Sequence, residues 1–496
     1  MGIAVQPGTG TEKQTKTTSR YAWYVLFVLT GMYMLSFVDR QILALLVPSI
    51  KRDLGVSDSR IGLLQGFSFA LFYTFVGLPL GRLVDTFNRR NLISVSVVAW
   101  SIFTSFCAAT KSYFSLFLTR VGVGVGEAGL SPAAYSLISD YFPTERIGAA
   151  ISIYYFGLFL GQSLALLVGG ITVDALARIP RIQVPLLGMI ASWRITFLIV
   201  GLPGLLFALL AFTIREPLRR HMLLTAEGEP VRSSFKEAVA QMKQRWQSVL
   251  GISVGMIFQS TCNYALSSWI PVFFPRIHGW TATETGKTLA VVMLVFACPG
   301  MYVGGILSDR WQKKGIADGP IRVALISAVG IFIFLTPAAI ISDARWTLAL
   351  LAIGMFLMSF PMGTSVAALQ LIFPNQVRGQ VAALFLFFLN LGGLTMGPYV
   401  PGWLNDYVFH NEHMLGTSLS LTIGGASILM FLVFLATLRS YRVHHAMTMQ
   451  IHDSKFEICN YRHAGEATSR PAKKTTWCLW KKRAQLQSED SKFEIE

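Results

Sequence analysis

The sequence predicts an all-α membrane protein with twelve transmembrane helices in two six-helix, pseudo-symmetric bundles. Three observations support this fold class: a composition poor in charge, twelve long apolar segments, and motifs that occur once in each half. Of the 496 residues, 53% are hydrophobic and 14% are charged, whereas a soluble domain carries about 25% charged residues. The composition therefore indicates a chain that lies mostly in lipid.

Apolar segments long enough to span a bilayer as a helix, about 20 residues, occur along the whole chain. Barrel strands do not fit, because they alternate in polarity and are only about ten residues long. The first segment is too long and too polar in its middle to be a cleaved signal peptide. We expect transmembrane helices at residues 22–47, 60–80, 91–109, 112–138, 147–172, 190–213, 248–274, 284–307, 321–341, 346–372, 379–400 and 415–437.

Two motifs recur six helices apart. GRLVDTFNRR (81–90) follows the second segment and GILSDRWQKK (305–314) follows the eighth. FPTERIG (142–148) and FPNQVRG (373–379) follow the fourth and tenth segments in the same way. Parallel repeats of this kind are found in transporters whose substrate site lies near the bilayer midplane, between the two halves.

The repeats define five parts of the chain. We expect an N-terminal tail, a six-helix bundle, a linker with an amphipathic helix along the inner membrane surface, a second bundle, and a solvated, disordered tail that contains DSKFEI twice. The boundaries are 1–20, 21–213, 214–247, 248–440 and 441–496.

The net charge of +16 comes from 42 Lys and Arg against 26 Asp and Glu. The basic residues gather mainly in the linker, the tail and the loops that lie on the same side as the N-terminus. This distribution follows the positive-inside rule and predicts both termini in the cytoplasm, with the protein in the inner (plasma) membrane. It argues against nucleic acid as the partner.

The five cysteines form no C-x-x-C pair, which argues against a disulfide framework or a zinc site. No catalytic or metal motif is present, so we expect no enzyme activity, no cofactor and no metal. GVGEAG (124–129) matches the dinucleotide pattern G-x-G-x-x-G, but it lies inside the fourth apolar segment without the strand that such a site requires. Gly122, Gly124 and Gly126 instead predict a narrow helix face for close packing.

The paired loop motifs predict a cytoplasmic gate. Their glycines would let helices pack closely, and their charged residues would form a latch between the halves; the alternative is a solvated loop that obeys the positive-inside rule. The gate residues are Gly81, Asp85, Arg89, Arg90, Gly305, Asp309 and Arg310.

Four charged residues lie within the first and fourth segments: Asp39, Arg40, Arg120 and Glu127. Helix rise places the first three at one level in the outer half, with Glu127 deeper. Charges at such depth cost about 2.5–3.5 kcal/mol each and persist where they face a cavity or one another. One hypothesis is a static brace between Asp39 and Arg120. The other is a coupling site, in which Asp39 and Glu127 exchange protons as arginine partners move.

Polar residues in the second half supply candidate substrate contacts. Each is also explained by a hydrogen bond between helices. They are Gln259, Asn263 and Tyr264 in the seventh segment and Asn390 in the phenylalanine-rich eleventh.

The sequence as a whole resembles the major facilitator superfamily, and within it the bacterial spinster-like branch. The resemblance covers about residues 20–440 and is carried by SFVDRQILALLVPSIKRDLGVSDSRIGLLQG, GRLVDTFNRRN, RVGVGVGEAGLSPAAYSL and WRITFLIVGLPGLL. It implies that Asp39 and Glu127 bind protons and that Arg40 and Arg120 bind or gate an anionic head group. Thr86 departs from the pattern, because an arginine commonly follows the motif aspartate.

The expected function is therefore secondary active transport by alternating access, coupled to protons, of an amphiphilic anion such as a lysophospholipid or sphingosine 1-phosphate. The alternative cargo is a small organic anion, since arginine pairs with phosphate and carboxylate alike. A different class, a non-transporting membrane receptor, is the third hypothesis. We expect a monomer that contacts membrane lipids.

Overall fold

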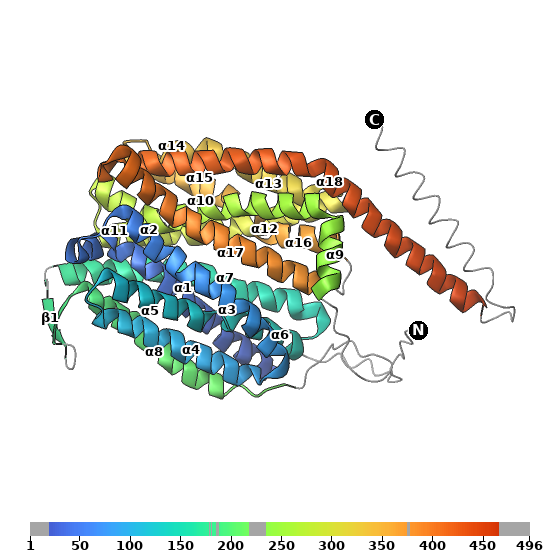
Figure 1. Ribbon diagram of the computed structural model, residues 1–496, viewed down its shortest axis with the longest axis horizontal. Helices are drawn as coiled ribbons and strands as arrows, with labels where there is room; N and C mark the ends of the chain where they lie inside the picture. Colours follow the sequence, from blue (N-terminus) through green and yellow to red (C-terminus); the bar gives the residue numbers. More distant parts are fainter. Residues whose placement is uncertain are drawn as a thin grey trace. The chain divides into compact units, whose positions relative to one another are not determined.

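The computed structural model describes residues 19–177, 179, 181–184, 188–217, 235–373 and 377–465. Residues 1–442 form one compact unit and residues 443–496 form a second. Within the first unit, the helices before the linker, blue through teal to green in Figure 1, lie beside those after it, yellow-green to red-orange. Residues 1–18 and 466–496 of the two predicted tails, the second DSKFEI copy among them, lie outside the described residues.

The described residues of the first half form eight α-helices. Their bounds are α1 (Arg20–Leu54), α2 (Asp58–Gln65), α3 (Phe67–Thr86), α4 (Arg89–Phe106), α5 (Tyr113–Glu127), α6 (Leu130–Tyr141), α7 (Thr144–Ala177) and α8 (Trp193–Phe212). The second and fourth predicted segments are each split, α2 from α3 at Gly66 and α5 from α6 after Glu127. Glycine favours such breaks because it adds no side chain that holds a helix together.

The second half repeats this plan with more interruptions. Within the linker lies α9 (Phe235–Gln244). The helices that follow it are α10 (Trp246–His278), α11 (Ala282–Val292), α12 (Cys298–Lys313), α13 (Gly319–Gly330), α14 (Thr336–Ala338), α15 (Ala344–Met358), α16 (Pro361–Leu371), α17 (Arg378–Trp403) and α18 (Leu415–Gly465). Wider turns at Met293–Ala297, Ile331–Leu335 and Leu404–Phe409 bend the predicted eighth and ninth segments and end the eleventh.

Twelve membrane segments are present, as predicted. Eleven helical segments within the described residues are long and apolar enough to cross a bilayer. The fourth segment is divided into α5 and α6, which are too short to qualify separately but follow one another along the chain. The protein thus has the two-bundle, twelve-helix fold of the prediction.

The repeat is also visible in how the helices end. α1 ends at Gly55 with φ 61° and α10 ends at Gly279 with φ 69°. Both glycines adopt the left-handed conformation that other residues rarely reach, which terminates a helix cleanly. The two positions are equivalent in the two halves, since α1 and α10 are the first and seventh membrane segments.

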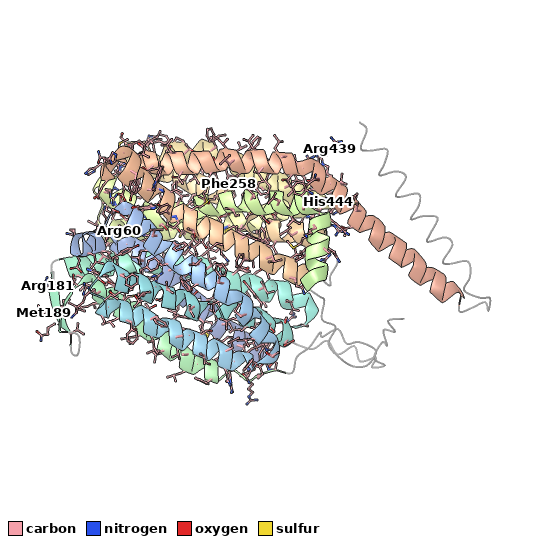
Figure 2. All side chains as sticks on the ribbon, in the orientation of Figure 1. Arg60, Arg181, Met189, Phe258, Arg439 and His444 are labelled. Carbon is pink, nitrogen blue, oxygen red and sulfur yellow. The ribbon has the colours of Figure 1, made fainter. Side chains whose placement is uncertain are left out.

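Two local features differ from the prediction. A short antiparallel hairpin, β1 (Arg181–Val184) with β2 (Gly188–Ala191), follows α7 and pairs Arg181 with Ala191. Figure 2 shows its Arg181 and Met189 at the end of the bundle where Arg60 also lies. The expectation of disorder from residue 441 is wrong up to Gly465, because α18 continues to that residue; the sequence offers no proline or glycine between Gly425 and Gly465 to end it.

The glycines of the fourth segment pack as predicted. A side chain at Gly126 would collide with the backbone of Trp100, and one at Gly124 with the backbone of Phe69. Gly122 packs against the ring of Phe103. The GVGEAG stretch is therefore a close helix–helix contact, which brings the carboxylate of Glu127 into the interior of the first half.

Candidate functional site

The centre of the first half holds an ion pair between α1 and α5. Nε of Arg40 donates to Oε2 of Glu127 at 2.7 Å, and Nη2 lies 2.6 Å from the same oxygen. The Glu127 side chain is fully buried and that of Arg40 is 17% exposed. Neither charge would persist in this apolar bundle without the other.

Aromatic rings surround the guanidinium group of Arg40. Its central carbon lies 4.8 Å from the ring centre of Phe37, 4.4 Å from Phe69 and 4.9 Å from Tyr73. Such contacts stabilise a cation by about 0.5–2 kcal/mol each, most strongly where water is excluded. The sequence analysis missed this arrangement, since the three rings come from two separate segments of the chain.

Asp39 and Arg120 lie next to this pair but do not form the predicted carboxylate–arginine brace. Thr104 donates to Oδ2 of Asp39 at 3.1 Å, while Nη1 of Arg120 donates to the Asp39 backbone carbonyl at 3.3 Å. Both side chains are buried. Consecutive residues on a helix point about 100° apart, which is why Asp39 faces α4 whereas Arg40 faces α3 and α5.

The predicted difference in depth between Arg40 and Glu127 does not keep their side chains apart. Arg40 was expected at a level above Glu127, yet the two are in direct contact. The length of the arginine side chain closes the gap that helix rise alone predicts. Among the described residues, Oδ1 of Asp39, Nε of Arg120 and Oε1 of Glu127 are buried and make no hydrogen bond.

Of the predicted substrate contacts in the second half, one joins two helices of that half and another lies near the charged site. Nε2 of Gln259 donates to the Met358 carbonyl at 3.1 Å, so Gln259 joins α10 to α15. Tyr264 packs against the hydrophobic core of the first half and lies within electrostatic range of Arg40 and Glu127. Asn263 and Asn390 are partly buried.

A tyrosine cluster borders the charged site. The rings of Tyr33 and Tyr154 stack with centres 4.3 Å apart, and Tyr135 and Tyr155 contact the same pair. The sequence does not predict this cluster, because its tyrosines lie in separate segments of the chain. Only the packing of α1, α6 and α7 brings them together. It gives the charged centre an aromatic wall with several hydroxyl groups.

The predicted gate residues behave differently from the prediction. Arg89 is buried and pairs with Asp140 of α6 and, at 2.6 Å, with Glu216, which follows α8 at the start of the linker. The backbone N–H of Arg90 donates to Glu216 as well. The Arg90 side chain donates to Asn91 instead. In this structure the guanidinium group of Arg89 therefore braces α4 against the ends of α6 and α8 rather than latching the two halves.

The second copy of the motif is solvated. Asp309 and Arg310 are exposed and form no ion pair within the described residues. The side chain of Asp85 lies outside the described part of the chain. A side chain at Gly81 or Gly305 would meet open space, so the prediction that these glycines allow close helix packing is wrong for this structure.

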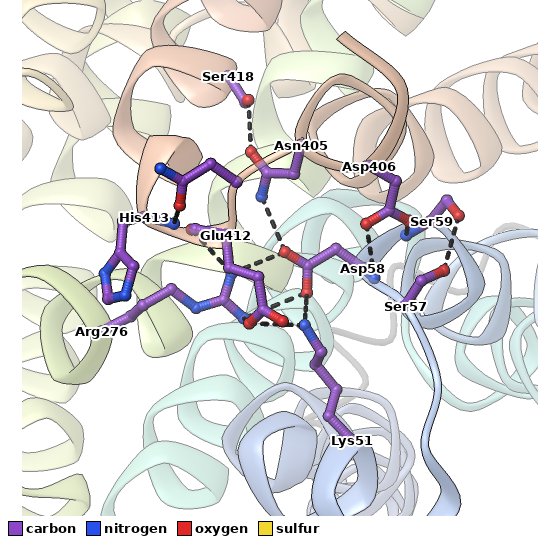
Figure 3. A network of polar contacts seen from close by, with 11 residues as sticks. Lys51, Ser57, Asp58, Ser59, Arg276, Asn405, Asp406, Glu412, His413 and Ser418 are labelled. Carbon is purple, nitrogen blue, oxygen red and sulfur yellow. Dashed lines mark hydrogen bonds and ion pairs between the residues drawn. The ribbon is translucent and has the colours of Figure 1, made fainter. Parts of the chain in front are cut away.

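At the opposite end of the bundle a polar network joins the halves (Figure 3). The buried carboxylate of Asp58 lies 2.7 Å from Lys51 Nζ, 2.7 Å from Arg276 Nη1 and 2.8 Å from Asn405 Nδ2. Lys51 and Asp58 belong to the first half, whereas Arg276 and Asn405 belong to the second. The sequence analysis did not identify this network.

A twelve-helix bundle with a buried charged site in one half and a polar contact closing one end is a membrane transporter by its architecture. The Major Facilitator Superfamily model matches residues 29–398. The chain belongs to this superfamily.

Individual relatives refine the assignment. The chain is 28% identical to an MFS-type efflux pump of Mycolicibacterium smegmatis, over 86% of this chain and 94% of the pump. It is 23% identical to the hexuronate transporter of Bacillus subtilis, over 77% and 87% of the two chains. Among solved structures, a bacterial homologue of the human lysosomal transporter spinster, inward-facing and unoccupied, is 26% identical and superposes with a TM-score of 0.70 over 88% of this chain and 99% of that chain. The protein is thus a spinster-like, multi-pass membrane transporter.

Proposed function

We propose that the protein is a proton-coupled secondary transporter of an amphiphilic anion, of the lysophospholipid or sphingosine 1-phosphate type. The observation that carries the proposal is the Arg40–Glu127 pair, which uses only Nε and Nη2 of Arg40 and only one oxygen of Glu127. Oε1 of Glu127 has no donor among the described residues. Both members of the pair therefore keep a free hydrogen-bonding position.

The pair can exchange partners. A phosphate or carboxylate that binds Arg40 competes with Glu127 for the guanidinium group. Once released, a buried carboxylate without a cation is stabilised by taking up a proton. Anion binding and proton binding then favour each other, which is the condition for moving both together.

Orientation follows from the positive-inside rule. With both termini in the cytoplasm of an inner-membrane protein, the Asp58 network lies on the outer side. The structure then corresponds to a state closed to the outside, in line with the inward-facing state of the spinster homologue. The solvated Asp309 and Arg310 fit an open cytoplasmic side.

Flux in proteoliposomes under an imposed pH gradient tests the proposal. Glu127→Gln and Asp39→Asn should abolish the pH-driven component, while Glu216→Gln, which removes a carboxylate from the Arg89 pair away from the centre, should keep it. Retention of wild-type pH-driven flux in both central variants contradicts proton coupling at this site.

A second cargo class, small organic anions, is supported by the hexuronate transporter among the relatives. A panel that contains a lysophospholipid, sphingosine 1-phosphate and hexuronate separates the two classes. The aromatic and tyrosine wall beside Arg40 favours the amphiphile, because rings cover an apolar chain better than they satisfy a polyol. Saturable binding of hexuronate alone, lost in Arg40→Ala, would favour the small anion.

A further inference from the structure

One arginine at the start of the second half is buried without a counter-ion. Arg245 lies between α9 and α10, and only 8% of its surface is exposed. Its side chain forms no hydrogen bond or ion pair with any residue in the described part of the chain, and its Nε is buried and unsatisfied. A buried charge of this kind is costly unless it is paired, so the environment of Arg245 lacks an anion.

The position of Arg245 at a helix end adds to this cost. Arg245 is the N-cap residue of α10, and its side chain makes no capping bond. The N-terminus of a helix carries a partial positive charge and favours anions over cations. Burial lowers the pKa of Arg245, and no carboxylate in the described chain opposes this effect. An anion bound here would remove both penalties.

The guanidinium group of Arg245 rests on a ring instead of an acid. Its central carbon lies 5.3 Å from the ring centre of Phe373. Arg378, the first residue of α17, donates from Nε to the Phe373 carbonyl at 2.8 Å. Arg378 likewise forms no ion pair within the described residues. Two arginines therefore contact one phenylalanine, and neither has a carboxylate partner in that part of the chain.

The internal repeat shows that this charge is specific to the second half. Phe373 begins the motif FPNQVRG, and its counterpart in FPTERIG is Phe142. Trp23, near the start of α1, packs edge-on against Phe142 with ring centres 5.3 Å apart. The contact between the start of a bundle's first membrane helix and this phenylalanine is thus made by an indole in one half and by a cation in the other. Packing alone does not require an arginine here.

The surroundings of Arg245 indicate a lipid as the source of the anion. The membrane segment Trp246–His278 begins at the next residue. Trp246 is 57% exposed, and Lys243 is exposed as well. Exposed tryptophan is typical of the head-group level of a bilayer, and basic residues directly beside a membrane helix attract anionic lipids. Arg245 therefore lies where lipid phosphates lie.

We propose that Arg245, together with Arg378, binds the phosphate group of an anionic phospholipid where the linker joins α10. The planar guanidinium group pairs with two phosphate oxygens through parallel hydrogen bonds. The lipid neutralises the buried cation while its acyl chains stay in the bilayer. This lipid is a structural ligand and not the cargo, because Arg245 and Arg378 belong to the linker and the second half, whereas the Arg40–Glu127 pair belongs to the first.

Native mass spectrometry of the full-length, delipidated protein in detergent tests the proposal. The first phosphatidylglycerol should bind more tightly than the first phosphatidylcholine, whose head group has no net charge. Arg245→Gln should lower the affinity for phosphatidylglycerol by about ten-fold or more, since hydrogen bonds to a charged group are lost. Arg439→Gln is the matched control and should leave this affinity unchanged, because Arg439 is an exposed arginine of the second half without an ion pair among the described residues.

Arg245→Trp separates lipid binding from folding, because an indole on Phe373 repeats the Trp23–Phe142 contact of the first half. This variant should keep the wild-type unfolding temperature and lose the preference for phosphatidylglycerol. Equal phosphatidylglycerol binding in the wild type and both Arg245 variants overturns the proposal, as does an equal loss in the Arg439 control.

Two further arms distinguish the source of the phosphate and the site. Inorganic phosphate in excess should not displace phosphatidylglycerol; binding of inorganic phosphate alone, dependent on Arg245, would show that the site takes a free anion and that the lipid assignment is wrong. Arg40→Ala should keep phosphatidylglycerol binding, whereas its loss there would place the lipid in the central site and contradict the proposal. The measurement needs neither flux nor a pH gradient, so it can fail independently of the proposed function.

Discussion

Arg40 of α1 and Glu127 of α5 lie in contact, with 2.6 Å between Nη2 and Oε2, in the interior of the first half. They are 87 residues apart in the chain. Gly122, Gly124 and Gly126, which let α5 approach α3 and α4 closely, bring Glu127 to this depth. The central pair therefore depends on a packing motif as much as on its own charges.

Arg40→Lys should strongly reduce transport, even though the substitution keeps the positive charge. A lysine keeps the cation but loses the two-nitrogen contact to Glu127 and the flat stacking on Phe37, Phe69 and Tyr73. We expect at least a ten-fold fall in substrate affinity, measured by binding to the purified protein. Wild-type affinity in the lysine variant would show that only charge matters at this position.

Arg89→Ala should destabilise the first half by about 1.5–3 kcal/mol, because it removes a buried guanidinium group that forms charged hydrogen bonds with Asp140 and Glu216. The equivalent basic residue of the second motif copy, Lys313, is exposed, and Lys313→Ala should change stability by less than about 0.5 kcal/mol. Thermal unfolding in detergent compares the two. Equal effects would contradict the brace assigned to Arg89.

Gly126→Val should lower stability by about 1–3 kcal/mol, since the added side chain meets the Trp100 backbone. Displacement of α5 would also move Glu127, so substrate binding should weaken. Gly305→Ala, which places a methyl group in open space, should leave both properties unchanged. Size-exclusion profiles and unfolding temperatures of the two variants provide the measurement.

Asp58→Ala should destabilise the protein by more than about 2 kcal/mol, because it leaves Lys51 and Arg276 with only the exposed carboxylate of Glu412 as a shared partner. Arg276→Ala should cost less, because Lys51 still pairs with the buried carboxylate of Asp58. The double variant should be less destabilised than the sum of the two, with a coupling energy of about 0.5–3 kcal/mol. Additive effects would mean that the two side chains do not stabilise the closed end as a pair.

Some features of the fold could be predicted from the sequence because they are local. A run of about 20 apolar residues has few alternatives to a membrane helix, so twelve segments were found. Motifs repeated six segments apart showed the two halves. Gly122, Gly124 and Gly126 predicted close packing correctly, since small residues on one face need no partner to be recognised.

The partners of the charged residues could not be predicted in this way. Asp39, Arg40, Arg120 and Glu127 were identified as site residues because charges are costly in lipid. One of the two hypotheses paired Asp39 with Arg120, whereas the structure pairs Arg40 with Glu127. The spacing of residues along a helix predicts how deep each side chain lies in the membrane, but it does not predict which neighbouring helix the side chain faces. Arg89 was taken for a gate residue for the same reason, because Asp140 and Glu216 lie far from it in the chain.

Hydropathy and the repeat in the chain determined by themselves that this is a two-bundle membrane protein with charges in its interior. Only tertiary structure decided which charges meet, that rings from α1 and α3 enclose Arg40, and that Arg245 lies on the ring of Phe373. The reason is physical: burial in lipid is a property of each segment alone, whereas an ion pair or a helix cap needs two groups that only the packing of distant helices brings within 3 Å or so.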